Sequence, residues 1–100
     1  PPAPAPGQQP FWHICSAQVD WQAIGKTRAQ TMAEARAAGI AFMVHYMPLH
    51  HHPILAKVAR ASDLAGADAA FPGILSIPCY VGLTADQQGQ VISWLTSLKR

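Results

Sequence analysis

The histidines of this sequence are the side chains best placed to do chemistry, because four of the five lie between His45 and His52. Tyr46 lies among them. Imidazole groups ligate metal ions, bind phosphates and transfer protons near neutral pH. A tetrahedral metal site needs about four ligands, and no second cluster of histidines, cysteines or carboxylates occurs at ligand spacing. We therefore predict a surface that contacts a ligand or a partner domain, without a metal. A histidine-based metal binder, and loop histidines that only cap short helices, stay open as alternatives.

The motifs of common catalytic sites are missing. The sequence contains no GxSxG, no phosphate-binding glycine loop and no HExxH, and its five carboxylates show no paired spacing. A lysine that forms a Schiff base needs a buried, tuned setting. Lys26, Lys57 and Lys99 instead lie at or near the ends of expected helices. We therefore expect no catalytic residue in this chain.

The composition indicates one compact domain. Half of the 100 residues are apolar and 12% are charged, which suffices for a buried core. The net charge of +2 is scattered rather than clustered, which argues against a nucleic-acid surface. No apolar run approaches the roughly 18 residues of a membrane span, and we expect Cys15 and Cys79 to be reduced, buried thiols. These features predict a cytoplasmic protein that contacts neither nucleic acid nor membrane.

The first half of the chain predicts a linker followed by a strand, a helix and a second strand. Residues 1–10 contain five prolines, a composition typical of an extended linker, and we place the folded domain at 11–100. Aromatic and β-branched residues predict a strand over 11–20. Good helix formers predict a helix over 28–38, and residues 40–47 return to strand character.

The second half predicts shorter elements. Residues 53–60 and 63–70 favour two short helices. Residues 74–81 favour a short strand that Pro78 interrupts, either at a sheet edge or as a brief extended segment. A final helix is expected after Thr84. The element order indicates an α+β fold, an α/β two-layer sandwich in which helices cover a small mixed sheet.

Helix boundaries give the most specific local signals. Thr27 with Gln30 and Thr84 with Gln87 have the spacing of capping boxes. Gly39 is expected to end the first helix in a left-handed conformation. The apolar stripe predicted for the last helix consists of Val91, Ile92, Leu95 and Leu98.

Two separated segments carry a recognisable pattern. Residues 45–53 read HYxPLHxHP, and residues 75–84 read LSIPCYxGLT. Together they resemble the DegT/DnrJ/EryC1 family of aminotransferases, and the resemblance covers nearly the whole chain from His13 onward. These proteins use pyridoxal phosphate, usually to aminate keto-sugars for cell-surface polysaccharides or sugar antibiotics. The resemblance therefore implies amino-sugar biosynthesis on a nucleotide-linked keto-sugar.

The same resemblance implies a place in a larger enzyme. In the type I aminotransferase fold of this family, a large domain holds the cofactor and a small C-terminal domain packs against it. The pattern matches the small domain, so the chain alone is expected to hold no cofactor, while the parent enzyme uses pyridoxal phosphate. The implied partners are the large domain, the nucleotide-sugar substrate and, in a homodimer, a second copy. His45, Tyr46 and His50 are the implied substrate-side or domain contacts.

One further interpretation from a different class stays open. The chain is also consistent with a stand-alone, non-catalytic binding or dimerisation module that retains the small-domain fold. The proline-rich start favours a truncated piece of a complete aminotransferase, because a family member crosses between its domains at this point. In either case the isolated chain is expected to be inactive.

Overall fold

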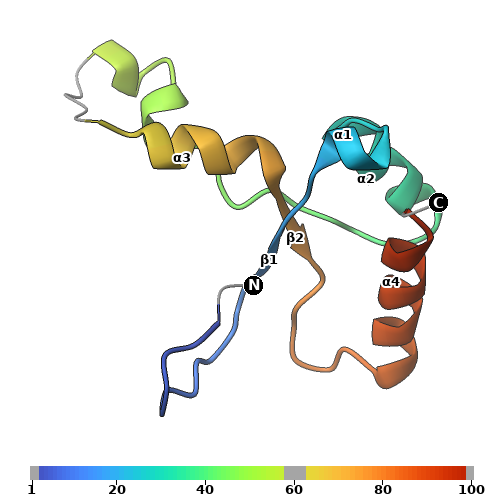
Figure 1. Ribbon diagram of the computed structural model, residues 1–100. Coiled ribbons are helices and arrows are strands. Elements are labelled where there is room, and N and C mark those ends of the chain that lie inside the picture. The colour runs from blue at the N-terminus through green and yellow to red at the C-terminus, as the bar shows by residue number, and fades with distance from the viewer. Residues whose placement is uncertain (1–2, 58–62, 99–100) are drawn as a thin grey trace.

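The computed structural model describes residues 3–57 and 63–98 (Figure 1). At its centre, β1 (Cys15–Gln18) and β2 (Ile74–Ile77) form a two-stranded antiparallel sheet. Helices lie on either side of this pair, with the longest ones gathered on one side (Figure 1). No described helix is both long enough and apolar enough to cross a membrane.

Strand β2 is paired on both of its edges. Ser76 lies opposite Ser16 in the sheet register. On its other edge, the Met43 N–H donates to the Ser76 carbonyl over 3.0 Å, and the Ser76 N–H donates to the Met43 carbonyl over 2.8 Å. Leu75 is 1% exposed. Among the described residues, β2 is one of only two strands in this sheet, so it lies at a sheet edge, with the isolated bridge to Met43 on its free side. Pro78 lies beyond the last residue of β2 and interrupts no hydrogen bond of the ladder.

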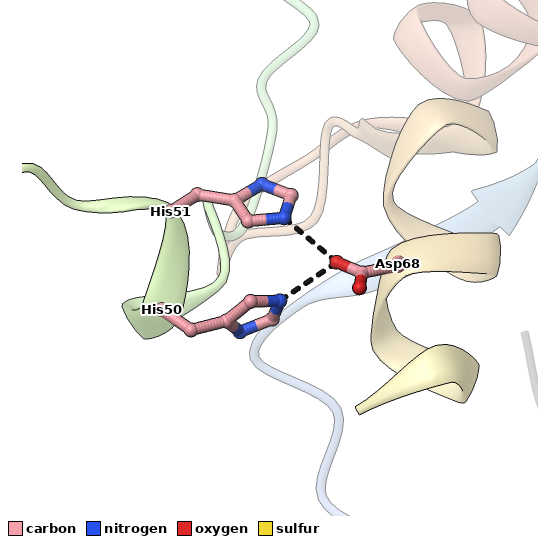
Figure 2. A group of neighbouring side chains, drawn as sticks. All are labelled: His50, His51 and Asp68. Carbon is pink, nitrogen blue, oxygen red and sulfur yellow. Dashed lines mark hydrogen bonds and ion pairs between the residues drawn. The ribbon is translucent and has the colours of Figure 1, made fainter. Parts of the chain in front are cut away.

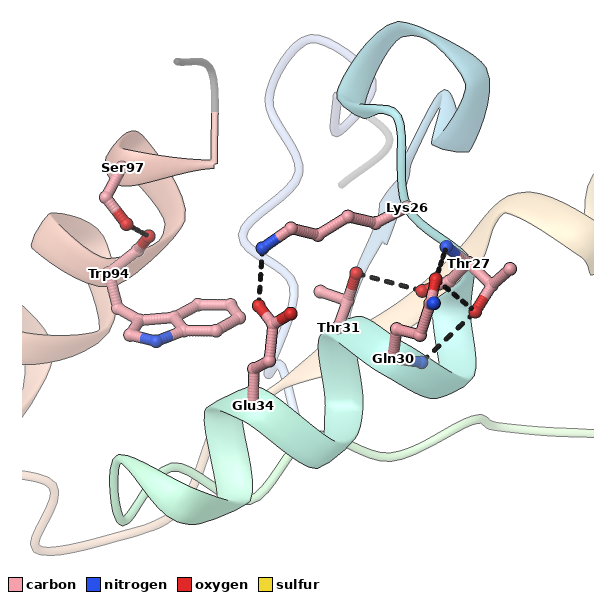
Figure 3. Close-up of polar contacts among 7 residues, drawn as sticks. All are labelled: Lys26, Thr27, Gln30, Thr31, Glu34, Trp94 and Ser97. Carbon is pink, nitrogen blue, oxygen red and sulfur yellow. Dashed lines mark hydrogen bonds and ion pairs between the residues drawn. The ribbon is translucent and has the colours of Figure 1, made fainter.

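Helix α2 (Arg28–Ala37) begins at the predicted capping box. The Gln30 N–H donates to the Thr27 hydroxyl over 3.2 Å, and the Thr27 N–H donates to the Gln30 side-chain oxygen over 2.9 Å (Figure 3). Thr31 is fully buried, and its hydroxyl donates to the Thr27 carbonyl, so the burial leaves no unpaired donor. Gly39 follows with a φ of 78°, as its position predicted.

Helix α4 (Ala85–Ser97) carries the second predicted capping box, between Thr84 and Gln87. Its inner face is narrower than the predicted stripe. Val91 is buried, whereas Ile92 is 62% exposed. Adjacent positions on a helix lie about 100° apart around its axis. Val91 therefore faces the core, while Ile92 faces solvent.

The core is a small cluster between α2, α4 and β2. The buried Phe42 ring meets the partly buried Trp94 ring edge to face, with centroids 5.4 Å apart. Such pairs add about 0.5–1.5 kcal/mol beyond the buried area. The buried apolar members of the cluster are Ala35, Ile40, Phe42, Leu75 and Val91.

A short helix between β1 and α2 was not foreseen. Helix α1 (Trp21–Ile24) is held by Asp20, whose carboxylate accepts the N–H groups of Gln22 and Ala23, each over 3.0 Å. Gly25 ends it with a φ of 71°. Four residues are too few to show a helical period, so only the cap signals could have indicated this turn.

The predicted strand at 40–47 is reduced to the single bridge at Met43. Beyond that bridge, the chain leaves the core as 3₁₀ turns η1 (Leu49–His51) and η2 (Leu55–Lys57). These turns replace the start of the helix predicted at 53–60, whose last three positions lie outside the described residues.

The chain returns through helix α3 (Ala65–Ala70), shorter than the predicted 63–70, and turn η3 (Phe71–Gly73). Arg28 joins this return to α2. Its guanidinium donates to the Phe71 carbonyl over 2.7 Å and lies 4.8 Å from the centre of the Phe71 ring. We name the part that extends from the core the projecting segment, which comprises residues 49–57 and 63–70 (Figure 1).

The predicted fold class, α+β, is confirmed. The observed sheet is smaller than the mixed sheet expected, and its one strand pair is antiparallel. Of the three strands predicted, two persist as four-residue strands.

Replacement of Leu75 by alanine should destabilise the chain strongly. The side chain is 1% exposed, and removal of a buried leucine costs about 2–5 kcal/mol. We expect a clear fall in the urea concentration at the midpoint of unfolding, with unfolding monitored by circular dichroism. Ile92→Ala is the control, because that side chain is 62% exposed and surface changes stay within about 0.5 kcal/mol. Equal effects of the two changes would contradict the packing described.

Candidate functional site

A surface pocket of about 400 Å³ opens beside the bridge between Met43 and Ser76. Core residues such as Ile40 and Val91 form part of its wall. A pocket with an apolar wall and a few polar groups is the usual form of a binding site. Its polar and aromatic lining includes His13, His45, Tyr80, Gln87 and Gln90.

His45 is the predicted site residue that lines this pocket. Its Nδ1 is buried and has no hydrogen-bond partner among the described residues. A buried polar atom without a partner costs about 1–3 kcal/mol. The Tyr46 ring meets the His45 ring edge to face at 4.6 Å, but Tyr46 itself is 70% exposed and does not line the pocket.

His50 lies in a different place. Its Nε2 is 2.7 Å from Oδ1 of Asp68, and the Nε2 of His51 is also 2.7 Å from that same oxygen (Figure 2). The hydrogen bond with His50 has the largest effect on the Asp68 carboxyl, followed by the bond with His51. Together they lower the pKa of this carboxyl below its ordinary value. The structure therefore separates His50 from His45 and Tyr46.

Asp68 is a site residue that the sequence analysis missed. It lies on α3, and His50 and His51 lie on η1. Seventeen or eighteen positions separate it from the two histidines. No spacing rule links residues so far apart, so the carboxylate could be found only from the fold.

Several large apolar side chains around these sites face solvent. They come from the N-terminal segment, from the chain between the pocket and η2, and from the loop after β2. Exposed apolar side chains that form a contiguous patch mark a surface that contacts another protein or domain. The most exposed are Phe11, Tyr46, Leu49, Ile54 and Val81.

The lysines within the described residues lie at the surface. Lys26 forms an ion pair with Glu34 (Figure 3), and its side chain is 38% exposed. Lys57 is exposed, and Lys99 lies outside the described residues. The described residues therefore do not form the buried lysine site that pyridoxal phosphate requires.

The two sequence motifs resemble an aminotransferase family, and comparison with known proteins agrees. The chain matches the DegT/DnrJ/EryC1/StrS aminotransferase family over residues 2–96, and it belongs to that family. The resemblance predicted from the two motifs is confirmed.

Individual relatives match over most of this chain. The spore coat polysaccharide biosynthesis protein SpsC of Bacillus subtilis strain 168 is 30% identical over 84 residues, which are 81% of this chain. The uncharacterized protein MJ1066 of Methanocaldococcus jannaschii is 25% identical over 84 residues, 82% of this chain. In both cases the match spans 22% of the relative's length.

A solved structure shows the same fold. It is that of Helicobacter pylori PseC, an aminotransferase involved in the biosynthesis of pseudoaminic acid. The superposition has a TM-score of 0.72 at 18% identity, and covers 87% of this chain but 24% of PseC. The chain therefore corresponds to about a quarter of the relatives it matches.

His45→Leu should stabilise the isolated chain. The substitution removes the buried Nδ1 that lacks a partner among the described residues, so we expect a gain of about 1 kcal/mol in the free energy of unfolding. Urea denaturation gives the measurement. His13→Leu is the control, because His13 is an exposed residue at the same pocket and should change stability little. A loss of stability in His45→Leu would show that the ring is paired in solution.

Proposed function

We propose that this chain is the small C-terminal domain of a pyridoxal-phosphate-dependent aminotransferase that acts on nucleotide-linked keto-sugars. The observation that carries the proposal is the family match over residues 2–96, combined with coverage of about a quarter of each relative. One relative is named for spore coat polysaccharide and another for pseudoaminic acid. Both names are consistent with an amino-sugar product for the parent enzyme.

In this proposal, residues 1–10 are the linker and residues 11–100 are the domain. Residues 3–10 contain no helix or strand and are exposed, and the first strand begins at Cys15. An extended, proline-rich segment suits a connection between two folded units. The large domain would precede it and would hold the cofactor, since the described lysines of this chain lie at the surface.

The large domain is the partner that we infer for the exposed apolar side chains. Tyr46 and Leu49 are each about seven-tenths exposed, and Ile54 is 82% exposed. Tyr46 is bonded directly to His45 of the pocket wall, so a domain seated on Tyr46 would lie next to a residue of the pocket. His45 would then contact substrate or the large domain from the wall of the pocket that it lines. Tyr46 would contribute to this contact, and His50, which lies apart beside Asp68, would contact the large domain at a separate point.

A non-catalytic binding or dimerisation module is the second candidate. The exposed apolar residues favour it as well, because a second copy of the chain would cover them equally. Sedimentation of the isolated chain as a function of concentration shows whether it self-associates. Assays of the full-length protein for transamination then separate the two candidates, since only the first predicts turnover.

The isolated chain should not bind pyridoxal phosphate covalently. Its described lysines are exposed or paired at the surface, so an aldehyde would react with them weakly and without selectivity. We expect borohydride reduction of a mixture to give only substoichiometric labels spread over several lysines, as measured by mass spectrometry. One lysine labelled stoichiometrically, and resistant to dilution before reduction, would overturn this placement of the cofactor.

In the full-length protein, His45→Ala should impair turnover or sugar affinity while the cofactor stays bound. The reason is that His45 is the predicted residue that reaches the pocket. Steady-state kinetics with a nucleotide-linked keto-sugar and the cofactor absorbance spectrum give the two measurements. His52→Ala is the matched control, because His52 lies outside the pocket lining. Unchanged kinetics in the His45 variant would remove His45 from the contact surface.

A further inference from the structure

The cluster of His50, His51 and Asp68 has a composition suited to a metal ion. Each residue offers one ligand atom, and the three atoms all lie within 4.8 Å of one another. The prediction of no metal was based on the lack of a companion ligand in the sequence. The fold supplies that ligand by placing α3 beside η1 (Figure 2).

We propose that His50, His51 and Asp68 bind a divalent transition-metal ion, with Zn²⁺ as the best fit. Two imidazole nitrogens and a carboxylate oxygen are typical ligands of zinc and its neighbours in the first transition row. Calcium and magnesium prefer sets made of oxygen atoms alone. The ligand types therefore select the class of ion.

Metal binding needs a local adjustment of the three ligand atoms, which all lie within 4.8 Å of one another. Zinc lies about 2.0–2.2 Å from nitrogen and oxygen ligands, so tetrahedral ligand atoms are about 3.4 Å apart. The two Nε2–Oδ1 distances are 2.7 Å, and each must lengthen by about 0.7 Å. Asp68 is half exposed, and its side chain has room to withdraw by that amount.

The metal would replace two hydrogen bonds. An ionised carboxylate only accepts, so each imidazole now donates its Nε2–H to Asp68. When the metal binds at Nε2, the proton of the neutral ring moves to Nδ1, and the carboxylate turns from acceptor to ligand. No redox change is involved, and the three ligand side chains keep their places around the same centre.

Neighbouring rings already hold the two imidazoles in convergent positions. The His50 and His51 rings meet edge to face with centroids 4.4 Å apart, and the His51 and Phe71 rings meet edge to face with centroids 5.7 Å apart. Preset ligand positions reduce the conformational entropy lost on binding. Three protein ligands leave at least one coordination position for water or another donor.

The test is metal titration of the full chain after removal of bound ions with a chelator. Calorimetry with Zn²⁺ should give one equivalent, and Co²⁺ should give the visible absorption of a low-coordinate site. Asp68→Ala, His50→Ala and His51→Ala should each weaken binding by about tenfold or more, since even changes next to metal ligands have effects of this size. The extended X-ray absorption fine structure of the zinc-loaded chain should show scattering from imidazole ligands.

His52→Ala is the matched control, because it removes a histidine from the same run but not from the cluster. Its affinity should equal that of the unmodified chain. If Asp68→Ala binds as tightly as the unmodified chain, or if His52→Ala weakens binding equally, the ion is held by the histidine run alone and the proposal fails. Absence of binding to the unmodified chain would also overturn it. Circular dichroism of each metal-free variant checks that the fold is intact, and none of these outcomes depends on the aminotransferase assignment.

Discussion

The pairing of Ser76 on both edges is the constraint on which the rest of the fold depends. Its backbone lies between Ser16 on one side and Met43 on the other. One short strand therefore holds three distant segments of the chain together. The adjacent Leu75 points into the core that α2 and α4 share, and the pocket opens along the bridge to Met43. The same strand thus contributes Leu75 to the core and Ser76 to the lining of the pocket.

Local chemistry explains which elements the sequence predicted well. Both capping boxes occur as expected, because Thr27 and Thr84 act within three residues of their partners. The predicted strands at 11–20 and 40–47 were too long, because a strand extends only where a partner lies beside it. Most of those residues have β character but meet no neighbouring backbone in a ladder. Strand length is a tertiary property, and no local pattern contains it.

In the candidate sites too, local contacts were predicted from the sequence, whereas contacts between distant segments were not. His45 and Tyr46 were predicted within one motif, and they remain in contact in the structure. His50 belongs to the same motif but turns toward Asp68, from which it is separated by much of the projecting segment. The helix that carries Asp68 is rich in alanine and glycine and has no distinctive sequence pattern. The contact of Asp68 with the two histidines therefore could not be predicted from the sequence and became evident only in the folded structure.

The position of Phe71 links the two halves of the molecule. Arg28, at the start of α2, covers the face of its ring, and the His51 ring of the projecting segment meets it edge to face. One aromatic side chain thus contacts both the packed helices and the projecting segment. A smaller residue at that position would remove both ring contacts and leave the hydrogen bonds to the backbone of residues 70–72 as the links between the two parts. The direction in which His51 points relative to the core would then be less firmly fixed.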